Sequence, residues 1–444
     1  MKPSRTAAAT KSELRRALGP RAAAAIAIAN TIGIGIFTTS GFVARDVGSP
    51  VRLLGLWLVG GLITIAGALS YAELGAELPQ AGGEYVYLRE AYGPLPAFLS
   101  GWTSLAVGFS GAIAAAMIAF AAYLRVLVPL LGAGVWSTRA EALVALWSIT
   151  VLHCTGLRGS GFTQRWLAAL TIGGVALMTA VGFFFGHGCF CNFRSFAPAG
   201  GNAAVSLIFI LYAYSGWNAA AYVAGELEAP QRSLPLALIG AATIVTMLYL
   251  ALNAMYLYAL PIGAMSGVLA IGEKALVALF GTSAGRPLGA MLAVTILGSG
   301  SAMIMAGPRV YFAMARDGLL PFSLGMVHRR YGTPTCAIIA QSGWATVLIL
   351  FFGGFEPLIT YTGFVIVGFT GLAVAGLIVI RLRRPDLQRP FLTPGYPWVP
   401  AAYVAVAIWI LSHTVASRPA EAALGALTIA AGLPFYFFAR LRAE

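Results

Sequence analysis

Twelve apolar stretches of about twenty residues follow one another along this chain, and they restrict its fold more than any other feature. A stretch of this length can cross the hydrocarbon core of a bilayer as a helix. Lipid offers no partners to backbone N–H and C=O groups, so we expect each stretch to be helical. The stretches lie at residues 22–43, 52–75, 94–124, 140–156, 163–186, 202–223, 234–259, 286–314, 335–353, 357–380, 398–414 and 420–439.

The amino-acid composition agrees with a fold that is surrounded by lipid. Of the 444 residues, 59% are hydrophobic and only 10% are charged. A soluble domain carries about 25% charged residues. The sequence therefore predicts an all-α integral membrane protein with about twelve transmembrane helices and the lipid bilayer as its surroundings.

The basic residues are divided unevenly between the two sides of such a bundle. The formal net charge is +13, with 28 Lys and Arg residues. If the two tails and the loops after even-numbered stretches share one side, 20 of these residues lie there and 8 lie on the other. Basic residues collect in cytoplasmic loops. We therefore expect both termini in the cytoplasm, an inner (cytoplasmic) membrane location and no nucleic-acid partner.

The sequence holds few residues suited to catalysis or metal binding. Its four cysteines predict no disulfide framework. His187, Cys189 and Cys191 lie close together, but this segment lacks the fourth ligand of a zinc site. No cluster of ionisable residues, nucleophile motif or phosphate-binding loop occurs in the sequence. An enzyme, a metal site and a cofactor are therefore not expected.

Two of the stretches carry residues that interrupt a helix in mid-membrane. The first contains Gly33 and Gly35, and each glycine inside a helix costs about 1 kcal/mol relative to alanine. The sixth contains Ser215 and Gly216. Small residues also occur where helices pack closely. Interruptions five helices apart, at matching places in two halves, instead indicate the binding site of a transporter.

Interrupted helices at the midplane supply both partial charges that an α-amino acid requires. The N–H groups that open the second half-helix carry positive partial charge and can bind a carboxylate. The C=O groups that end the first half-helix can receive an ammonium group or a cation. The pattern favours an amino acid as substrate. It disfavours a channel, since pores repeat identical elements around an axis.

Four local patterns resemble the amino acid–polyamine–organocation (APC) family, in particular its L-type amino acid transporter branch. They are Asn30–Phe37; Tyr71–Gly75 with Gly82–Tyr87; Tyr212–Asn218 continuing into Gly225–Pro235; and Gly307–Tyr311 with Ala315–Pro321. The third pattern is the most specific of the four because it is long and ordered. Arg389–Phe391, ahead of the eleventh stretch, fits the same family.

The resemblance implies a five-plus-five inverted repeat with discontinuous helices 1 and 6 and two accessory C-terminal helices. The implied parts are a cytoplasmic tail (1–21), the first repeat (22–186), the second repeat (202–380), the accessory helices (398–439) and a C-terminal cytoplasmic tail (440–444). It also implies secondary active transport of amino acids by alternating access, either by exchange or by symport with an ion.

The resemblance further implies a substrate site between the two interruptions. The residues whose backbone N–H groups are expected to receive the substrate carboxylate are Gly33, Ile34 and Gly35. The residues whose carbonyl groups are expected to receive its amino group are Ile32, Tyr212, Ala213 and Ser215. Tyr212 also occupies the place of an aromatic gate. We expect Asn218 to face the site, and Trp217 to line it because it lies away from the predicted helix ends.

The coupling ion stays open at this point. Some family members carry a lysine in the fifth helix that takes the place of a sodium ion, whereas this stretch has no lysine and places Thr171 there. Proton coupling through such a lysine is therefore not expected. Exchange without an ion, H⁺ coupling at another group, and a Na⁺ ion held by oxygens such as those of Ser299 and Ser301 are the alternatives.

Ionisable residues inside a membrane are rare and usually functional. The sequence places no carboxylate in mid-membrane in the first, third, sixth, eighth or tenth stretch. A dication would need a buried anion, so a neutral amino acid is predicted. Transport of a polyamine or a cationic amino acid, and a membrane sensor that does not transport, are the alternatives. The short loops predict a chain that works without a partner subunit.

Charged residues that follow the sixth and eighth stretches form a candidate inner gate. Glu226 and Glu228 are expected to pair with Arg232 or Arg316 near the cytoplasmic face. The alternative is a set of solvated helix ends, since long charged side chains there reach water easily.

Overall fold

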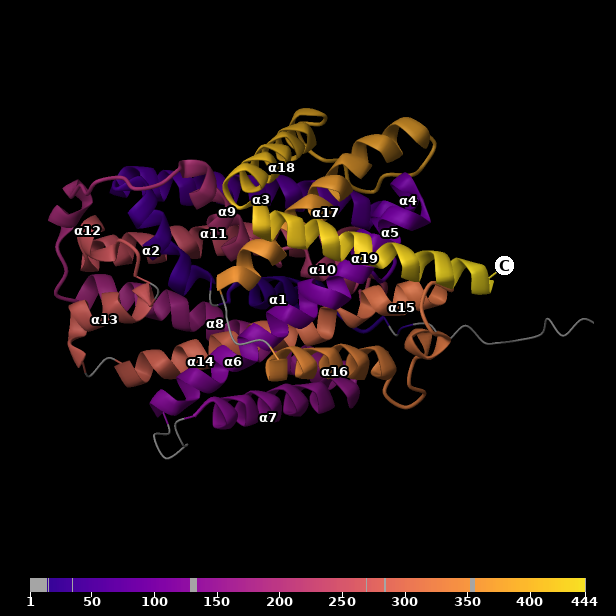
Figure 1. Ribbon diagram of the computed structural model, residues 1–444, viewed down its shortest axis with the longest axis horizontal. Helices are drawn as coiled ribbons and strands as arrows, with labels where there is room; N and C mark the ends of the chain where they lie inside the picture. The colour runs from indigo at the N-terminus through magenta and orange to yellow at the C-terminus, as the bar shows by residue number, and fades with distance from the viewer. Residues whose placement is uncertain are drawn as a thin grey trace, which may run out of the picture.

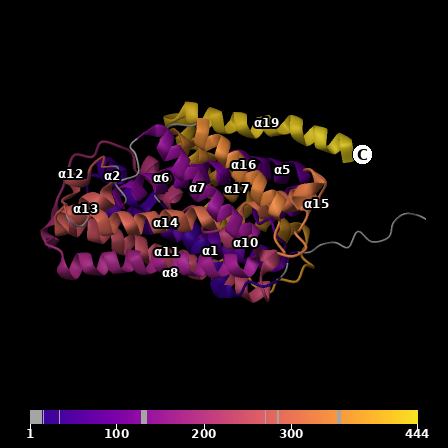
Figure 2. The same cartoon turned by 90° about the horizontal axis from the view of Figure 1, so that it is seen from below.

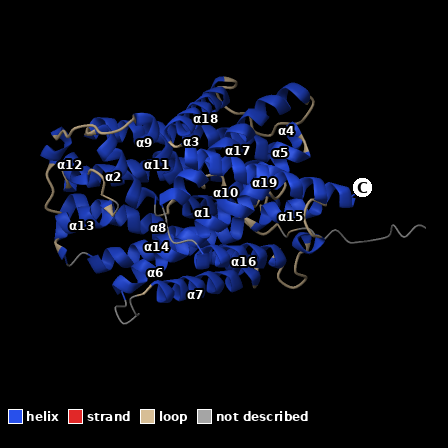
Figure 3. Ribbon diagram, viewed as in Figure 1, coloured by secondary structure: helices blue, strands red, loops and turns tan. Residues whose placement is uncertain are grey.

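The computed structural model describes residues 14, 16–33, 35–127, 134–268, 270–282, 285–351 and 356–443. Helices form most of this part of the chain (Figure 3). The described residues contain no strand, and their β pairing is limited to an isolated bridge between Leu18 and Leu227. The predicted all-α fold class is confirmed.

Eight of the described helices are long and apolar enough to cross a membrane, or nine if the bent pair α1 (Pro20–Thr31) and α2 (Gly35–Val47) counts as one span. The eight are α3 (Pro50–Glu77), α5 (Pro94–Thr103) with the π-helical turn η1 (Ser104–Gly108) and α6 (Phe109–Leu127), α8 (Leu157–Phe185), α11 (Pro230–Ala259), α14 (Gly285–Ala306) with α15 (Pro308–Arg316), α17 (Glu356–Arg383), α18 (Trp398–Ser417) and α19 (Pro419–Ala443).

Three predicted stretches form helices that are shorter or less apolar. They are the sixth, which divides into α9 (Ala203–Tyr214) and α10 (Ala219–Tyr222), the fourth, α7 (Val135–Cys154), and the ninth, α16 (Thr335–Phe351). Each of the twelve stretches thus falls on one helix or on a divided one. The other helical segments are α4 (Glu84–Tyr92), η2 (Phe190–Arg194), η3 (Ala224–Glu226), α12 (Ile262–Met265), α13 (Ile271–Phe280) and η5 (Phe322–Gly325).

Proline marks the start of several of these helices. The residues at the starts of α3, α5, α11, α15 and α19 are Pro50, Pro94, Pro230, Pro308 and Pro419. Proline costs little there, because the first N–H groups of a helix have no partner within it and the fixed φ suits the first turn. The sequence thereby defines where these helices begin.

Helices at matching places in the two halves pack against each other. α3 packs on α11 and α6 packs on α14, while α1 lies against α8, α11 and α14. Of the eight spans, that of α14 and α15 is the most enclosed, with 72% of its apolar window buried, whereas the value for α19 is 22%. α18 and α19 lie on the outside, against α17 (Figures 1 and 2). This is the order expected of two five-helix repeats followed by two accessory helices.

The two ends of the described chain lie at the same end of the bundle. α4, α15 and the C-terminal end of α19 gather there, and α12 and α13 lie at the opposite end (Figure 1). The N–H of Leu18 donates to the Glu226 carbonyl (3.0 Å), and the N–H of Glu228 donates to the Leu18 carbonyl (2.9 Å). These bonds fix the start of the chain beside the segment that follows α10. An even number of crossings accounts for this arrangement.

The loop between α8 and α9 contains a disulfide that the sequence did not predict. Cys189 and Cys191 are bonded to each other, with their Cα atoms 5.2 Å apart. The 3₁₀ turn η2, which begins at Phe190, bends the chain so that residues two apart approach. The expectation of no disulfide is therefore wrong for this pair, whereas Cys154 and Cys336 are free thiols.

Candidate functional site

The first interruption separates α1 from α2. The two helix axes differ in direction by 45°. The N–H of Ile32 still donates to the Ile28 carbonyl (2.8 Å), and the N–H of Gly33 donates to the Thr31 carbonyl (2.9 Å). Ile34 lies outside the described residues. The interruption thus lies where the two glycines predicted it.

The second interruption separates α9 from α10 and includes Gly216, whose φ is +95°. Side chains with a Cβ rarely adopt this conformation. A Cβ at this position would also lie 2.7 Å from the backbone oxygen of Asn30. The side chain of Asn30 donates to the Gly216 carbonyl (3.2 Å). Glycine is therefore required both by the backbone conformation and by the approach of α1.

A tyrosine from α11 joins the two interruptions. The hydroxyl of Tyr249 lies 2.9 Å from the Thr31 carbonyl and 3.0 Å from the Ala213 carbonyl, and it donates to them. Next to this point a Cβ on Gly35 would lie 2.9 Å from the Cα of Ala213. The ends of α1 and α9 and the start of α2 are therefore held in direct contact. Tyr249 was not predicted as a site residue. Its sequence signal is a hydroxyl-bearing side chain in the middle of the seventh apolar stretch, and the structure buries it fully.

Two adjacent cavities adjoin the interruptions. The first, which we call the break cavity, has a volume of about 50 Å³, and residues that line it include Thr31, Gly33, Gly35, Tyr212, Ala213, Ser215 and Ser299. The second, which we call the Glu84 cavity, has a volume of about 80 Å³, and residues that line it include Glu84, Ser100, Thr103, Asn218, Tyr222 and Phe369. Both share Asn30, Ala112, Ser215 and Met303. The predicted substrate residues Gly33, Gly35, Tyr212, Ala213 and Ser215 therefore line the break cavity, and Asn218 lines the Glu84 cavity next to it.

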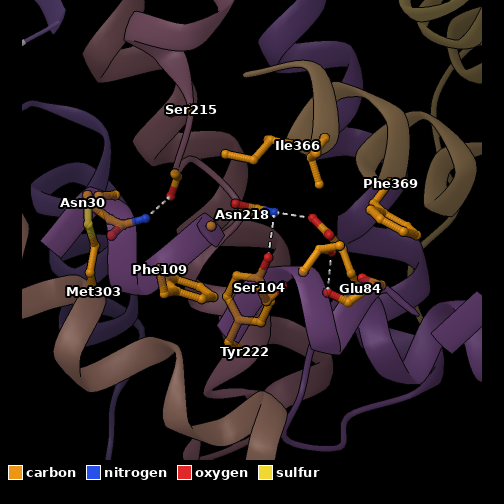
Figure 4. A pocket seen from close by; sticks show the side chains of 16 residues that line it. Asn30, Glu84, Ser104, Phe109, Ser215, Asn218, Tyr222, Met303, Ile366 and Phe369 are labelled. Atoms are coloured by element: carbon orange, nitrogen blue, oxygen red, sulfur yellow. Dashed lines mark hydrogen bonds between the residues drawn. The ribbon is translucent and has the colours of Figure 1, made fainter. Parts of the chain in front are cut away.

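Glu84 brings a carboxylate into this space, which the sequence analysis did not anticipate. Its side chain is only 6% exposed. The side-chain amide of Asn218 donates to Glu84 Oε1 (2.6 Å) and to the hydroxyl oxygen of Tyr222 (3.1 Å), as Figure 4 shows. The expectation that no carboxylate reaches the site holds for the five transmembrane stretches examined but fails for the loop helix α4. Folding returns the start of α4 to the cavity.

Two glycines explain why Glu84 reaches the cavity. Gly82 has a φ of +123° and Gly83 a φ of +54°. A Cβ on Gly83 would lie 2.6 Å from the ring of Tyr222, and one on Gly82 would lie 2.9 Å from Ala313. The pair therefore forms a tight turn against α10 and α15 that a larger residue would push away. The Gly82–Gly83–Glu84 pattern was the sequence signal for this position.

Burial raises the pKa of the Glu84 carboxyl group to about 7, while the neighbouring hydroxyls and the Asn218 amide act in the opposite direction. Removal from water penalises the charged form of a carboxyl group. At neutral pH, protonated and ionised Glu84 are therefore both populated.

Trp217 lines neither of these two cavities. It lines a third cavity of about 30 Å³ together with Tyr403 of α18, and the residues that this cavity shares with the Glu84 cavity are Ser215, Gly216, Asn218 and Ile366. Its ring packs edge-on against Tyr71, with centroids 4.8 Å apart. The structure therefore packs Trp217 between α10 and the outer helices, whereas its neighbour Asn218 faces the Glu84 cavity.

The predicted ion-site residues separate into two groups. Ser299 lines the break cavity, and its hydroxyl lies 3.2 Å from where a Cβ on Gly33 would stand. Thr171 is buried one layer further out, 3.6 Å from the corresponding point on Gly298. Its hydroxyl has no hydrogen-bond partner within the described residues. The structure thus brings Ser299 to the interruption and places Thr171 behind it.

Ser301 faces a different polar cluster. Its hydroxyl lies 2.9 Å from Nε2 of His153 and donates to Oε1 of Gln164 (3.0 Å). Residues two apart on a helix point in very different directions, so Ser301 turns away from the break that Ser299 faces. The two serines therefore do not form one site.

The predicted inner gate has a different cation from the one expected. The guanidinium of Arg309 donates to both carboxylate oxygens of Glu226 (2.6 and 3.1 Å), and its third donor reaches the Met305 carbonyl. Both partners are almost fully buried, at 2% and 0% exposure. The pairing of Glu226 with Arg232 or Arg316 is therefore wrong. Those two arginines and Glu228 are exposed. Arg316 is the last residue of α15, about two turns beyond Arg309 on the same face, and it lies at the exposed end of that helix.

Further charged groups at this end of the bundle are also paired. Arg381 donates twice to Glu73 (2.7 Å each), and the N–H of Thr393 donates to the same carboxylate (2.7 Å). Asp317 accepts from Tyr85 (2.6 Å) and from Arg89. Together with Arg309 and Glu226 these residues form what we call the ion-paired layer. It closes the end of the bundle at which α4 and α15 lie.

Comparison with known proteins agrees with this architecture. The family model described as amino acid permease matches residues 18–431. The serine/threonine exchanger SteT of Bacillus subtilis is 29% identical over 430 residues, covering 96% of this chain and 97% of the relative. The large neutral amino acids transporter small subunit 2 of Mus musculus is 31% identical over 442 residues, covering 96% and 81%. The cystine/glutamate transporter of Homo sapiens is 30% identical over 437 residues, covering 96% and 86%.

Proposed function

Because this chain belongs to the amino acid permease family, we propose that it is a secondary active transporter that carries neutral amino acids across the cytoplasmic membrane by alternating access. The observation that carries the proposal is the contact between the two interruptions. Tyr249 joins the carbonyls of Thr31 and Ala213 (2.9 and 3.0 Å), beside the start of α2. The carbonyl groups at the ends of α1 and α9 and the start of α2 therefore lie close together beside one cavity.

In this proposal the backbone binds the two charges that all α-amino acids share. The N-terminal end of α2, which begins at Gly35, receives the carboxylate, since a helix N-terminus carries positive partial charge. The N–H of Gly33, which donates to the Thr31 carbonyl in this structure, would have to exchange that bond for one to the substrate. The carbonyls of Ile32 and Ala213 and the Ser215 segment receive the ammonium group. Tyr212 lines the same cavity and covers the bound substrate. The side chain of the substrate extends into the Glu84 cavity.

The names of the relatives support neutral substrates and exchange. One is named for serine and threonine exchange and another for large neutral amino acids. A neutral substrate was predicted because no carboxylate was expected near the site, but Glu84 supplies a buried one. A lysine-like substrate or a diamine is therefore the second candidate, and the test below includes it.

The ion-paired layer supports the alternating-access part of the proposal. Arg309 and Glu226 join α15 to the segment after α10, which moves if α10 tilts. We assign this end to the cytoplasm, because the basic loops collect at it. Opening toward the cytoplasm then requires these pairs to separate or to rotate together. In this proposal the ion pairs of the layer belong to a state that is closed on the cytoplasmic side.

The test is transport by the purified chain in liposomes. Uptake of labelled serine, leucine, alanine, glutamate, lysine and a diamine would be measured with unlabelled amino acid inside, or with a proton or sodium gradient in its place. We expect saturable uptake of neutral amino acids that depends on internal amino acid. Uptake confined to lysine or the diamine would favour the second candidate. If no compound moves under any condition, the proposal of transport is wrong and a sensing role takes its place.

A further inference from the structure

Glu84 differs from the other fully enclosed carboxylates in having no cation beside it. In the described part of the chain, the other carboxylates with almost no side-chain exposure each have an arginine nitrogen close by: Asp46 with Arg45 (3.1 Å), Glu73 with Arg381 (2.7 Å), Glu226 with Arg309 (2.6 Å) and Glu77 with Arg389 (3.9 Å). No such ion pair involves Glu84 among these residues, and its hydrogen-bond donor is the neutral amide of Asn218. An enclosed carboxylate without a cation is costly when ionised and tends to bind a proton instead.

Among the described residues, no element packed around Glu84 supplies a positive charge that would stabilise its ionised carboxylate. The titratable side chains that interact with it are the phenols of Tyr71, Tyr87, Tyr222 and Tyr403. α5 contributes no titratable residue. The charged groups on α3, α4, α15 and α17 have other partners or face solvent: Arg89 with Asp317, Arg309 with Glu226, Arg381 with Glu73, Arg383 with the Ala91 carbonyl, Arg389 with Glu77, Arg384 with Glu90, and Arg316 at the surface.

The place of Glu84 connects its protonation to substrate binding. Its cavity shares the lining residues Asn30, Ala112, Ser215 and Met303 with the break cavity. A substrate held at the interruptions therefore lies next to the space that the Glu84 carboxylate faces and restricts the access of water to it. Loss of that water disfavours the ionised form further.

We propose that the Glu84 carboxyl group is a proton-binding site of the transport cycle, which takes up a proton from water as a neutral amino acid fills the two cavities and returns it when the substrate leaves. The carboxylate oxygen gains the proton, and no bond of the substrate changes. This inference rests on the proposed function. It gives the chain a proton site in a loop helix rather than in the fifth helix, where Thr171 stands in place of a lysine.

Linkage gives the sign and the size of the expected effect. Since binding raises proton affinity, substrate affinity must fall as pH rises through the range in which Glu84 titrates. If bound substrate raises the pKa by one unit from about 7, affinity at pH 8 is roughly fivefold weaker than at pH 6. The full change in affinity is then about tenfold, and most of it falls within these two pH units.

The experiment is a direct count of protons during binding. Purified full-length protein in detergent, weakly buffered at pH 7 with an indicator dye, receives serine or leucine, and the same addition without protein is subtracted. We expect uptake of a measurable fraction of one proton per transporter. Net proton flux is a poorer readout, because an exchanger returns the proton with the outgoing amino acid.

Three variants make the result specific to Glu84. Glu84→Gln mimics the protonated form, so it should bind substrate with an affinity that is constant from pH 6 to pH 8 and should take up no proton. Glu84→Asp keeps a carboxyl group and should retain proton uptake, which guards against a folding defect in the glutamine variant. Asp386→Asn removes an exposed carboxylate and should behave as the unmodified chain does.

The outcomes separate this inference from the proposed function. Exchange of amino acids in liposomes without any proton uptake on binding, or equal uptake by Glu84→Gln, would overturn the inference alone. Proton release on binding of lysine, abolished in Glu84→Gln, would overturn it in favour of a cation subsite. If no amino acid binds or exchanges, the proposed function fails and this inference fails with it.

Discussion

The Glu84 cavity and the ion-paired layer both enclose a carboxylate, but they treat its charge in opposite ways. Glu226 in the layer receives two hydrogen bonds from Arg309, at 2.6 and 3.1 Å. Glu84 in the cavity receives one from the neutral amide of Asn218. Only a few residues along the chain separate Asn218 from Glu226. A fixed ion pair suits a closure that must hold, whereas a carboxyl group without a cation can change its charge during each cycle.

The largest expected effect comes from breaking the pair in the layer. Arg309→Met leaves Glu226 buried without a cation, which costs about 3–5 kcal/mol. We expect a large loss of folded protein and a marked fall in the melting temperature in detergent. The matched control is Arg316→Met, on the same helix but exposed, which should change stability little. A larger loss of stability for Arg316→Met than for Arg309→Met would instead support the pairing of Glu226 with Arg316 that the sequence predicted.

A second variant tests whether the layer needs its charges at all. Glu226→Gln combined with Arg309→Met removes both ions, and replacing a buried pair by neutral groups is often close to neutral for stability. The double variant should therefore recover much of the stability lost by Arg309→Met. The absence of any recovery would mean that Arg309 stabilises the fold mainly through other contacts, such as its bond to the Met305 carbonyl.

The backbone of the cavity region should be nearly as sensitive. Gly216→Ala places a Cβ at a φ of +95° and 2.7 Å from Asn30 O, and an unfavourable φ alone costs about 1–3 kcal/mol. We expect at least a tenfold fall in exchange, measured in liposomes with folded protein. Gly240→Ala in α11, where a Cβ meets nothing within 4 Å, is the control and should exchange normally. Normal exchange by Gly216→Ala would show that the second interruption tolerates another conformation.

The interruptions were predictable from sequence because glycine and serine in mid-membrane have few explanations. The twelve apolar stretches were predictable because lipid enforces helices of a fixed length. The partner of Glu226 was not, since Arg309 and Arg316 are seven residues apart and therefore lie on the same face of α15, about two turns apart. Only the depth of that helix in the bundle decides which of the two is buried. Glu84 was missed because a loop position gives no sign of burial. Glu84 is enclosed because the turn at Gly82 and Gly83 directs it into the bundle. A hydropathy profile along the sequence does not reveal such a turn.

Removing the Tyr249 hydroxyl, which joins the two interruptions, should reduce transport less than Gly216→Ala does. Tyr249→Phe removes the hydroxyl that donates to the carbonyls of Thr31 and Ala213. The Thr31 carbonyl keeps the Gly33 N–H as a donor, whereas the Ala213 carbonyl loses this one, and an unsatisfied buried group costs about 1–3 kcal/mol. We expect substrate affinity to fall by roughly fivefold to tenfold, because the carbonyls are no longer held in place for the ammonium group. Counterflow at a range of serine concentrations measures this. Tyr258→Phe, whose hydroxyl donates to the Gly186 carbonyl near the loop after α8, is the matched control and should keep the affinity unchanged.

The smallest effect is expected at the serine that faces the first interruption. Ser299 lies beside Gly33, where a sodium ion would need a hydroxyl ligand, whereas Ser301 on the same helix bonds to Gln164. If the proton at Glu84 is the ion of the cycle, no sodium ion is needed, and Ser299→Ala should change exchange by less than about twofold, which corresponds to a fraction of a kcal/mol. Uptake would be compared in sodium and in choline buffer. Sodium dependence in the unmodified chain that Ser299→Ala abolishes would assign coupling to this region instead. The difference between the cavity and the layer would then lie in a bound metal ion rather than in the protonation of a carboxyl group.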